Sequence, residues 1–198
     1  MCFVQAVLLC IAMLPVSNQA ISRVEREVAL ERLRTSRERF LQSIESLSES
    51  QWRFKPSPFR WSIAECAEHI AATEEQYLQT LTKLLESQPS EAAEPALKDS
   101  ELSAIYTDRN LKRTAPASLQ PKGRWPSRSL LLEHFNQTRA KVIAIGETTQ
   151  APLRSYRSRA AYQNLMDGYQ WFLRFAGHCE RHTAQIEEVK AHPNFPKK

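Results

Sequence analysis

Glycine is scarce in this chain, with 4 residues among 198. Sheet-rich folds with many tight turns need residues that tolerate positive φ, and glycine is the usual choice. So few glycines argue against such a fold. The chain is 42% hydrophobic and 25% charged, and it is long enough to bury one core. The composition therefore predicts a soluble, mainly helical protein with a single domain.

Charge is absent from the first twenty residues, which contain no Lys, Arg, Asp or Glu. The apolar run from Cys2 to Val16 is shorter than the roughly 20 residues that a membrane-spanning helix needs. Small and polar residues follow it up to Ala20, as is typical of a secretory signal peptide. We expect residues 1–20 to be a signal peptide, residues 21–198 to form the mature domain, and the protein to be secreted or periplasmic. The alternatives are an uncleaved anchor and a mis-assigned start, the latter with a cytoplasmic protein.

The sequence contains no recognisable nucleic-acid-binding motif. Lys and Arg number 27 against 22 Asp and Glu, a net charge of +5 that is spread along the chain. A diffuse excess of this kind fits a solvated basic surface best, and the alternative is a surface that favours acidic ligands or anionic membranes. We therefore expect a small-molecule partner, no nucleic acid, and no stable membrane association once the leader is cleaved.

Cysteine is also rare, and only Cys66 and Cys179 lie outside the predicted leader. An exported protein can pair two cysteines in a disulfide. Both positions fall inside predicted helices, however, and sequence alone does not reveal pairing. Two buried free thiols are the alternative.

Apolar residues recur at helical spacing in four segments, which predicts helices over about residues 22–49, 62–87, 129–147 and 160–190. The second helix has the clearest start, because Ser62 and Glu65 form the pattern of a capping box. Glu74 lies on the apolar face of this helix, and the sequence offers no explanation for a carboxylate there. Four helices predict an all-α four-helix bundle.

The segment of residues 88–128 separates the second and third predicted helices and contains five prolines. It has one short predicted helix, over about residues 99–112. A connection this long inside a compact domain is unusual unless it crosses the bundle or covers a site. We expect a long crossover that either covers a substrate or partner site or forms a mobile surface segment.

Two histidines on the last predicted helix have a spacing that suits a metal ion. His178 and His182 are four residues apart and align with Trp171 and Val189 rather than with the charged face. Two imidazoles at this spacing can reach one ion. A pair of buried, hydrogen-bonded histidines is the alternative. His69, at the edge of the second helix's apolar face, is a candidate third ligand, although its position alone fits a structural histidine equally well.

Two motifs resemble the DinB-like superfamily: W-S-I-A-E-C-A-E-H-I at Trp61–Ile70 and Y-Q-W-F-L-R-F-A-G-H-C-E-R-H-T-A-Q-I at Tyr169–Ile186. The resemblance implies a four-helix bundle with a three-histidine metal centre whose ligands are His69, His178 and His182. Three imidazoles suit Zn²⁺, Ni²⁺, Fe²⁺ or Mn²⁺ and leave coordination positions open, as in catalytic sites. Gln185 is placed for a supporting contact and Cys66 for an alternative soft ligand, with helix packing the other interpretation of both.

The resemblance also implies a class of chemistry, because characterised relatives resemble thiol-dependent S-transferases that use mycothiol or bacillithiol, or metal-dependent hydrolases. An exported protein would not meet a cytosolic thiol, so export favours hydrolysis over thiol transfer. The alternative is a non-catalytic exported metal-binding or stress-associated protein, whose site would be closed to solvent. A cavity beside the histidines would favour the enzyme. Bundles of this type often dimerise, so a homodimer is possible.

Overall fold

The computed structural model describes residues 20–89, 97–159 and 165–197. The predicted signal peptide, apart from Ala20, lies outside these residues. As predicted, the fold is an all-α bundle of four long helices, which are α1 (Arg23–Ile44), α3 (Ile63–Glu86), α5 (Arg128–Thr148) and α6 (Gly168–Lys190). The shorter elements are α2 (Glu49–Arg53), α4 (Asp99–Thr107), the 3₁₀ turns η1 (Ala117–Leu119) and η2 (Leu153–Ser155), and the strands β1 (Arg157–Arg159) and β2 (Leu165–Asp167). None of the described helices combines the length and the apolar character that a membrane span requires.

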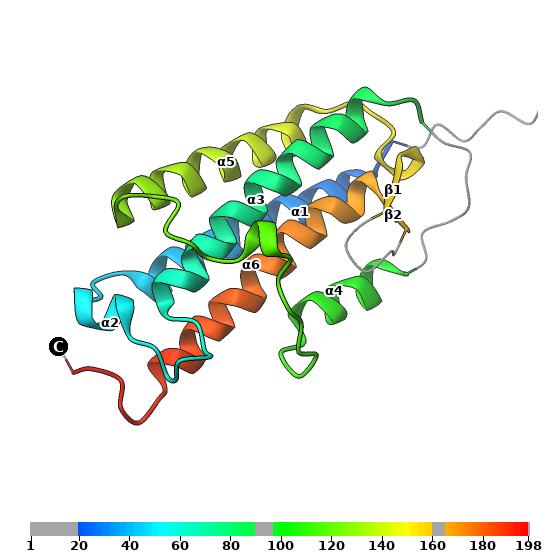
Figure 1. Ribbon diagram of the computed structural model, residues 1–198. Coiled ribbons are helices and arrows are strands. Elements are labelled where there is room, and N and C mark those ends of the chain that lie inside the picture. The colour runs from blue at the N-terminus through cyan, green and yellow to red at the C-terminus, as the bar shows by residue number, and fades with distance from the viewer. Residues whose placement is uncertain (1–19, 90–96, 160–164, 198) are drawn as a thin grey trace, which may run out of the picture.

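The order of the helices around the bundle differs from their order along the chain. α1 packs against α5 and α6, and α3 packs against the same two helices. In Figure 1, α1 and α6 run in one direction while α3 and α5 run in the other. The neighbours α3 and α5 are therefore parallel, so the chain must return along the bundle before α5 can begin. The predicted crossover is this return, and α4 packs against α6 on the way.

Side-chain caps set where the long helices begin. The predicted capping box of α3 is present, because the Ser62 N–H donates to Glu65 Oε2 at 2.7 Å and the Glu65 N–H donates to Ser62 Oγ at 3.1 Å. Ser127 caps α5 by accepting from the Leu130 N–H at 3.2 Å. A cap of this kind stabilises a helix by about 1 kcal/mol.

The first predicted helix ends earlier than expected. α1 stops at Ile44, and Ser46 adopts a left-handed φ of 57° that breaks the helix. Ser48 then caps the separate helix α2, with Gln51 completing the box. The predicted helix over 99–112 is also shorter, because α4 ends at Thr107.

The last predicted helix begins later than expected. Residues 160–164 lie outside the described part of the chain, and α6 starts at Gly168 instead of residue 160. The reason is an antiparallel pairing of β1 with β2, after which Asp167 caps α6 by accepting from the Gln170 N–H at 2.7 Å. A Cβ at Gly168 would lie 2.8 Å from the Leu153 carbonyl oxygen, so glycine is required for η2 to approach this end of the helix.

A buried ion pair accounts for Glu74 on the apolar face of α3. Its carboxylate receives two hydrogen bonds from the guanidinium of Arg139 on α5, one of them from Nε at 3.0 Å. Arg139 Nη1 also donates to the Leu33 carbonyl oxygen at 2.6 Å and to Ser36 Oγ at 2.8 Å, both on α1. Arg139 is 0% exposed and Glu74 is 1% exposed. The pair therefore joins three of the four long helices inside the core.

Arg154, in η2, links the N-terminal ends of α1, α4 and α6. Its guanidinium bonds Glu25 in the first turn of α1, Asp99 at the start of α4 and Asp167 at the N-cap of α6. Its Cζ lies 4.1 Å from the Tyr169 ring centroid. These contacts hold α4, the first part of the crossover, against the beginning of α6.

The two cysteines of the described chain are free and buried. Burial raises the pKa of the Cys66 thiol well above its ordinary value, and burial raises the pKa of Cys179 to about 12. Both are therefore protonated at neutral pH. The alternative of a disulfide between them is wrong.

We expect Arg139→Met to lower the free energy of unfolding by about 3–5 kcal/mol, because it leaves the Glu74 carboxylate buried without its partner. The control is Arg34→Met, which removes the exposed pair between Arg34 and Glu147 and should cost no more than about 1 kcal/mol. Urea unfolding of both variants measures the difference. Equal losses would show that burial of the ion pair adds nothing to its contribution.

Candidate metal centre

Two antiparallel helices bring three histidines together. His69 comes from α3, while His178 and His182 come from α6 and lie one turn apart. One ring nitrogen from each residue can be chosen so that all three atoms lie within 4.8 Å of one another. The ring centroid of His182 is 4.5 Å from those of both other histidines. All three side chains are buried. They are the residues that the family resemblance had implied as ligands.

Hydrogen bonds on the far side of two rings decide which nitrogen faces the cluster. His69 Nδ1 lies 2.9 Å from the Leu119 carbonyl oxygen, which can only accept, so Nδ1 carries the proton and Nε2 keeps its lone pair. His182 Nδ1 lies 2.9 Å from Gln185 Oε1 and donates in the same way. Histidines that bind metals are held by this kind of contact. Gln185 thus occupies the supporting position considered from the sequence.

The third histidine lacks such a contact. His178 Nδ1 is buried without a hydrogen-bond partner in the described part of the chain, and His178 Nε2 lies 3.2 Å from His69 Nε2. Nitrogens that bind one ion tetrahedrally at about 2.1 Å are themselves roughly 3.4 Å apart. The spacing of His69 and His178, and a donor set of three nitrogens within 4.8 Å of one another, suit one divalent ion such as Zn²⁺.

Burial keeps the imidazoles neutral. Desolvation lowers the pKa of His69, and it lowers the pKa values of His178 and His182 well below the ordinary value, with repulsion from the neighbouring imidazoles acting in the same direction. Neutral imidazole is the form that coordinates a metal. The cluster is thus in its ligating form at neutral pH.

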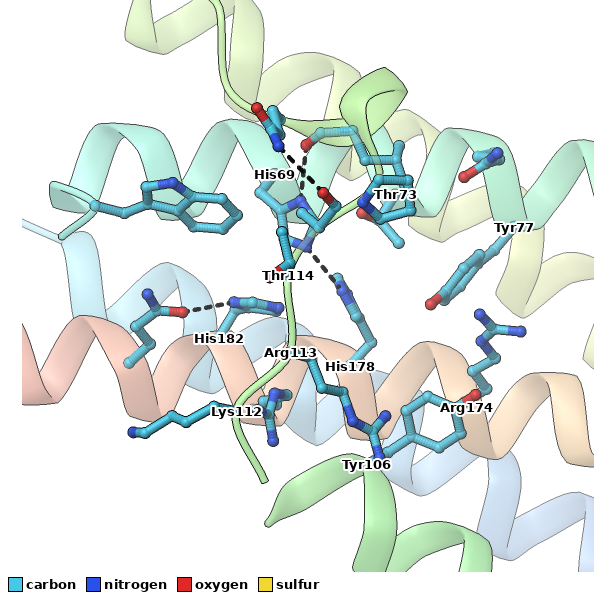
Figure 2. A pocket seen from close by; sticks show the side chains of 18 of the residues that line it. His69, Thr73, Tyr77, Tyr106, Lys112, Arg113, Thr114, Arg174, His178 and His182 are labelled. Carbon is cyan, nitrogen blue, oxygen red and sulfur yellow. Dashed lines mark hydrogen bonds between the residues drawn. The ribbon is translucent and has the colours of Figure 1, made fainter. Parts of the chain in front are cut away.

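The three histidines open into a pocket of about 790 Å³ (Figure 2). Trp61, Tyr77 and Trp171 contribute to its wall. Trp61 lies 4.9 Å from the His69 ring and 6.1 Å from the His182 ring, measured between centroids. Trp171 lines the pocket without filling it. The site is therefore a cavity beside the histidines, not a closed cluster.

The crossover forms one side of this pocket. Residues 112–116, together with Leu119 and Gln120, line it, and Figure 2 shows their backbone passing in front of the histidines. Glu68, next to His69 on α3, anchors this segment. Its carboxylate accepts from the backbone N–H groups of Lys122, Gly123 and Arg124 at 2.7, 2.9 and 3.2 Å. Gly123 has a φ of 74°, so glycine suits the turn that aims these groups at Glu68.

The charge of the pocket wall has one sign. No Asp or Glu lines the pocket among the residues that the structure describes, whereas seven basic residues do, namely Arg60, Arg109, Lys112, Arg113, Arg159, Arg174 and Arg181. A concave basic wall attracts anionic ligands. The modest net charge of the chain is thus concentrated where a ligand would bind.

The remaining histidines and the candidate Cys66 lie outside the cluster. Cys66, considered as a soft ligand, is buried in the hydrophobic core with Phe40 and Ile63 and does not belong to the group of possible ligands. His134 packs against Trp125 at the side of the bundle, and His192 lies in the C-terminal segment.

Three polar residues of the site escaped the sequence analysis. Arg174 and Thr73 each lie four residues from a clustered histidine on the same helix, and this spacing could have predicted that they line the pocket. Glu68 had no such signal, because its partners are backbone groups of an irregular segment more than fifty residues away.

We expect His69→Ala, His178→Ala and His182→Ala each to abolish stoichiometric binding of Zn²⁺, because two imidazoles form a much weaker site. His134→Ala is the matched control and should retain one equivalent. Elemental analysis after dialysis against zinc measures the content. Full occupancy in any of the three cluster variants would rule out that residue as a ligand.

Acid should release the metal. Protons compete for the imidazoles, and since burial lowers the pKa values of all three, we expect release only below about pH 6. In the metal-free protein the same shifts make the free energy of unfolding fall as pH decreases below about 6.5, because the unfolded chain binds protons more readily. Zinc content and urea unfolding across pH 4–8 test both. Retention of zinc at pH 4 would indicate carboxylate or thiolate ligands.

The fold has a solved counterpart. The structure of YfiT from Bacillus subtilis, described as a probable metal-dependent hydrolase with an unusual four-helix bundle topology, superposes with a TM-score of 0.61 at 12% identity. The match covers 90% of this chain and 93% of YfiT. At this identity the likeness shows the fold alone.

Sequence comparison gives the family. The chain is 28% identical over 149 residues to the uncharacterized protein YuaE from Bacillus subtilis (strain 168), which covers 74% of this chain and 88% of YuaE. The sequence profile of the DinB superfamily matches residues 32–186, a range that includes all three clustered histidines and most of the bundle. The chain is a member of the DinB superfamily.

Proposed function

We propose that this protein is a metal-dependent hydrolase of small molecules, with one divalent metal on His69, His178 and His182. The observation that carries the proposal is the opening of three buried, neutral imidazoles into a pocket of about 790 Å³. A metal with open coordination positions, when bound there, lowers the pKa of a coordinated water toward neutrality and polarises a substrate carbonyl or phosphoryl group. Zn²⁺, Ni²⁺, Fe²⁺ and Mn²⁺ all suit three imidazoles.

The chain's own part is to hold the ligands and shape the space above them. The Leu119 carbonyl and the Gln185 side chain fix the orientation of His69 and His182. Trp61 packs over these two rings and limits the approach of water from its side. The crossover, attached to α3 through Glu68, supplies the opposite wall.

The described pocket wall contains no carboxylate to act as a general base. Among the described residues, no imidazole besides the three clustered histidines lines it. The proton that the attacking water loses would therefore pass to the leaving group, directly or through solvent at the mouth of the pocket. This arrangement suits a reaction in which the nucleophile is already ionised near neutral pH.

The non-catalytic alternative requires a site closed to solvent, and the pocket argues against it. Thiol transfer is the second candidate. It is favoured by the same open pocket, since a coordinated thiolate could occupy a position beside the histidines and the basic wall could accept an acidic thiol. The two reactions differ in whether water or a thiol is consumed.

The test uses the full chain, stripped of metal and reloaded with each of the four ions. We expect hydrolysis of one class in a panel of activated esters, amides, lactones and phosphoesters, lost on chelation and reduced at least about 100-fold in His178→Ala. Gln185→Ala should weaken metal affinity about 10–100-fold, because it leaves His182 without its partner. Turnover that survives both chelation and His178→Ala would overturn the proposal, as would a metal-dependent reaction that consumes a thiol and never water.

A further inference from the structure

Arg174 is a buried cation with no ion-pair partner among the described residues and with unused hydrogen-bond donors. It lies on α6 one turn before His178, is 3% exposed, and lines the pocket. Its Nε and Nη1 atoms have no hydrogen-bond partner, and no ion pair involves it among the residues that the structure describes. Leaving such donors buried and unpaired is costly, so an unsatisfied group of this kind requires an explanation.

The other buried arginines show that the fold ordinarily satisfies this side chain. Arg139 bonds Glu74 and two further acceptors. Arg181, also on α6 and in the pocket wall, donates to the carbonyl oxygens of Asp108 and Leu111. Both are as deeply buried as Arg174. The unused donors of Arg174 are therefore a local feature of the pocket.

Aromatic rings hold the guanidinium in place. Its Cζ lies 4.2 Å from the ring centroid of Tyr77, 4.7 Å from that of Trp171 and 5.3 Å from that of Tyr106. Ring faces stabilise the positive charge at these distances. They do not replace in-plane acceptors for Nε–H and Nη1–H. The side chain is thus fixed and charged, with two donors available to a molecule in the pocket.

A second unused polar atom lies on the same side of the histidines. Thr73 lines the pocket, and its Oγ1 is buried without a hydrogen-bond partner among the described residues. Thr73 comes one turn after His69 on α3, and Arg174 comes one turn before His178 on α6. Because the two helices are antiparallel, both residues are displaced from the histidines in the same direction, as Figure 2 shows. Four helical residues correspond to about 6 Å along the axis.

The remaining cations of the wall differ from Arg174. Arg60 and Arg109 share the carboxylate of Glu188. Lys112 is exposed at the rim. Arg174 is thus a deeply placed cation of the described wall with unused donors, which suit a singly charged oxyanion. A guanidinium binds a carboxylate through two parallel hydrogen bonds.

We propose that the ligand of this pocket carries a carboxylate that binds Arg174, about one helical turn (~6 Å) from the group that lies over the histidines. If the protein is the hydrolase proposed above, this ligand is its substrate, and the inference rests on the proposed function only in that respect. The binding itself does not require turnover.

The test measures binding by the full chain of benzoate, its neutral counterpart benzamide, and phenyl phosphate. Calorimetry is performed on metal-free and zinc-loaded protein, because in the metal-free form the anion cannot bind zinc. We expect benzoate to bind both forms and more tightly than benzamide or phenyl phosphate. Arg174→Met should lose about 10–100-fold in benzoate affinity, the range for a charge-assisted hydrogen bond.

The matched control is Arg109→Met, which removes another arginine from the same wall and changes the net charge equally. The affinity of Arg109→Met for benzoate should stay within about threefold of that of the unmodified chain, because Arg109 contributes only long-range electrostatic attraction. Equal losses in the two variants would replace the proposal with a diffuse basic potential. Preference for phenyl phosphate would overturn the assignment to a carboxylate.

Thermal unfolding separates recognition from a purely structural role. Arg174→Met should fold with a midpoint close to that of the unmodified chain, and benzoate should raise the midpoint of the unmodified chain and not of the variant. Arg174→Lys, which keeps the charge and loses the fork, should bind benzoate with intermediate affinity. Destabilisation of both variants with unchanged benzoate affinity would show that the aromatic rings hold Arg174 for stability alone. Benzoate binding that depends on Arg174 in a protein without hydrolase activity would uphold this inference and refute only the proposed function.

Discussion

The parallel orientation of α3 and α5 is the constraint on which the rest of the structure depends. A chain that leaves α3 at one end of the bundle and enters α5 at the other must cover the length of a helix along the outside of the four long helices. That path passes α6 and the histidines, and it provides one wall of the pocket. The cavity is thus in part a consequence of topology: with antiparallel neighbours and a short loop, the three histidines would lack this wall.

Two contacts turn this return path into part of the site. Glu68 binds the backbone of residues 122–124, and the Leu119 carbonyl, a few residues earlier, orients His69. Glu68 and His69 are neighbours on α3, so one short stretch of helix both anchors the crossover and contributes a candidate ligand. Movement of the crossover and the orientation of that imidazole are therefore mechanically linked.

The features that could be predicted from the sequence are those with local causes. Helical periodicity identified the four long helices, a capping box identified the start of α3, and spacing placed His178 beside His182. His69 was assigned through resemblance to a family, because its neighbours come from another helix. The helix boundaries that differed from the prediction had nonlocal or conformational causes. α1 ends early because Ser46 adopts a left-handed backbone conformation, and α6 begins late because β1 and β2 pair before it. Glu74 was noticed as an anomaly, and its partner, Arg139, lies 65 residues away.

The attachment of the crossover has an implication for how members of this superfamily diverge. Glu68 bonds main-chain N–H groups, which every residue except proline possesses, and only position 123 carries a conformational demand. The side chains at positions 122 and 124 are therefore free to change while this backbone anchorage is preserved. Selection can alter the wall that meets the ligand independently of the helices that hold the histidines, so that one reactive centre can be retained while its preference among substrates drifts.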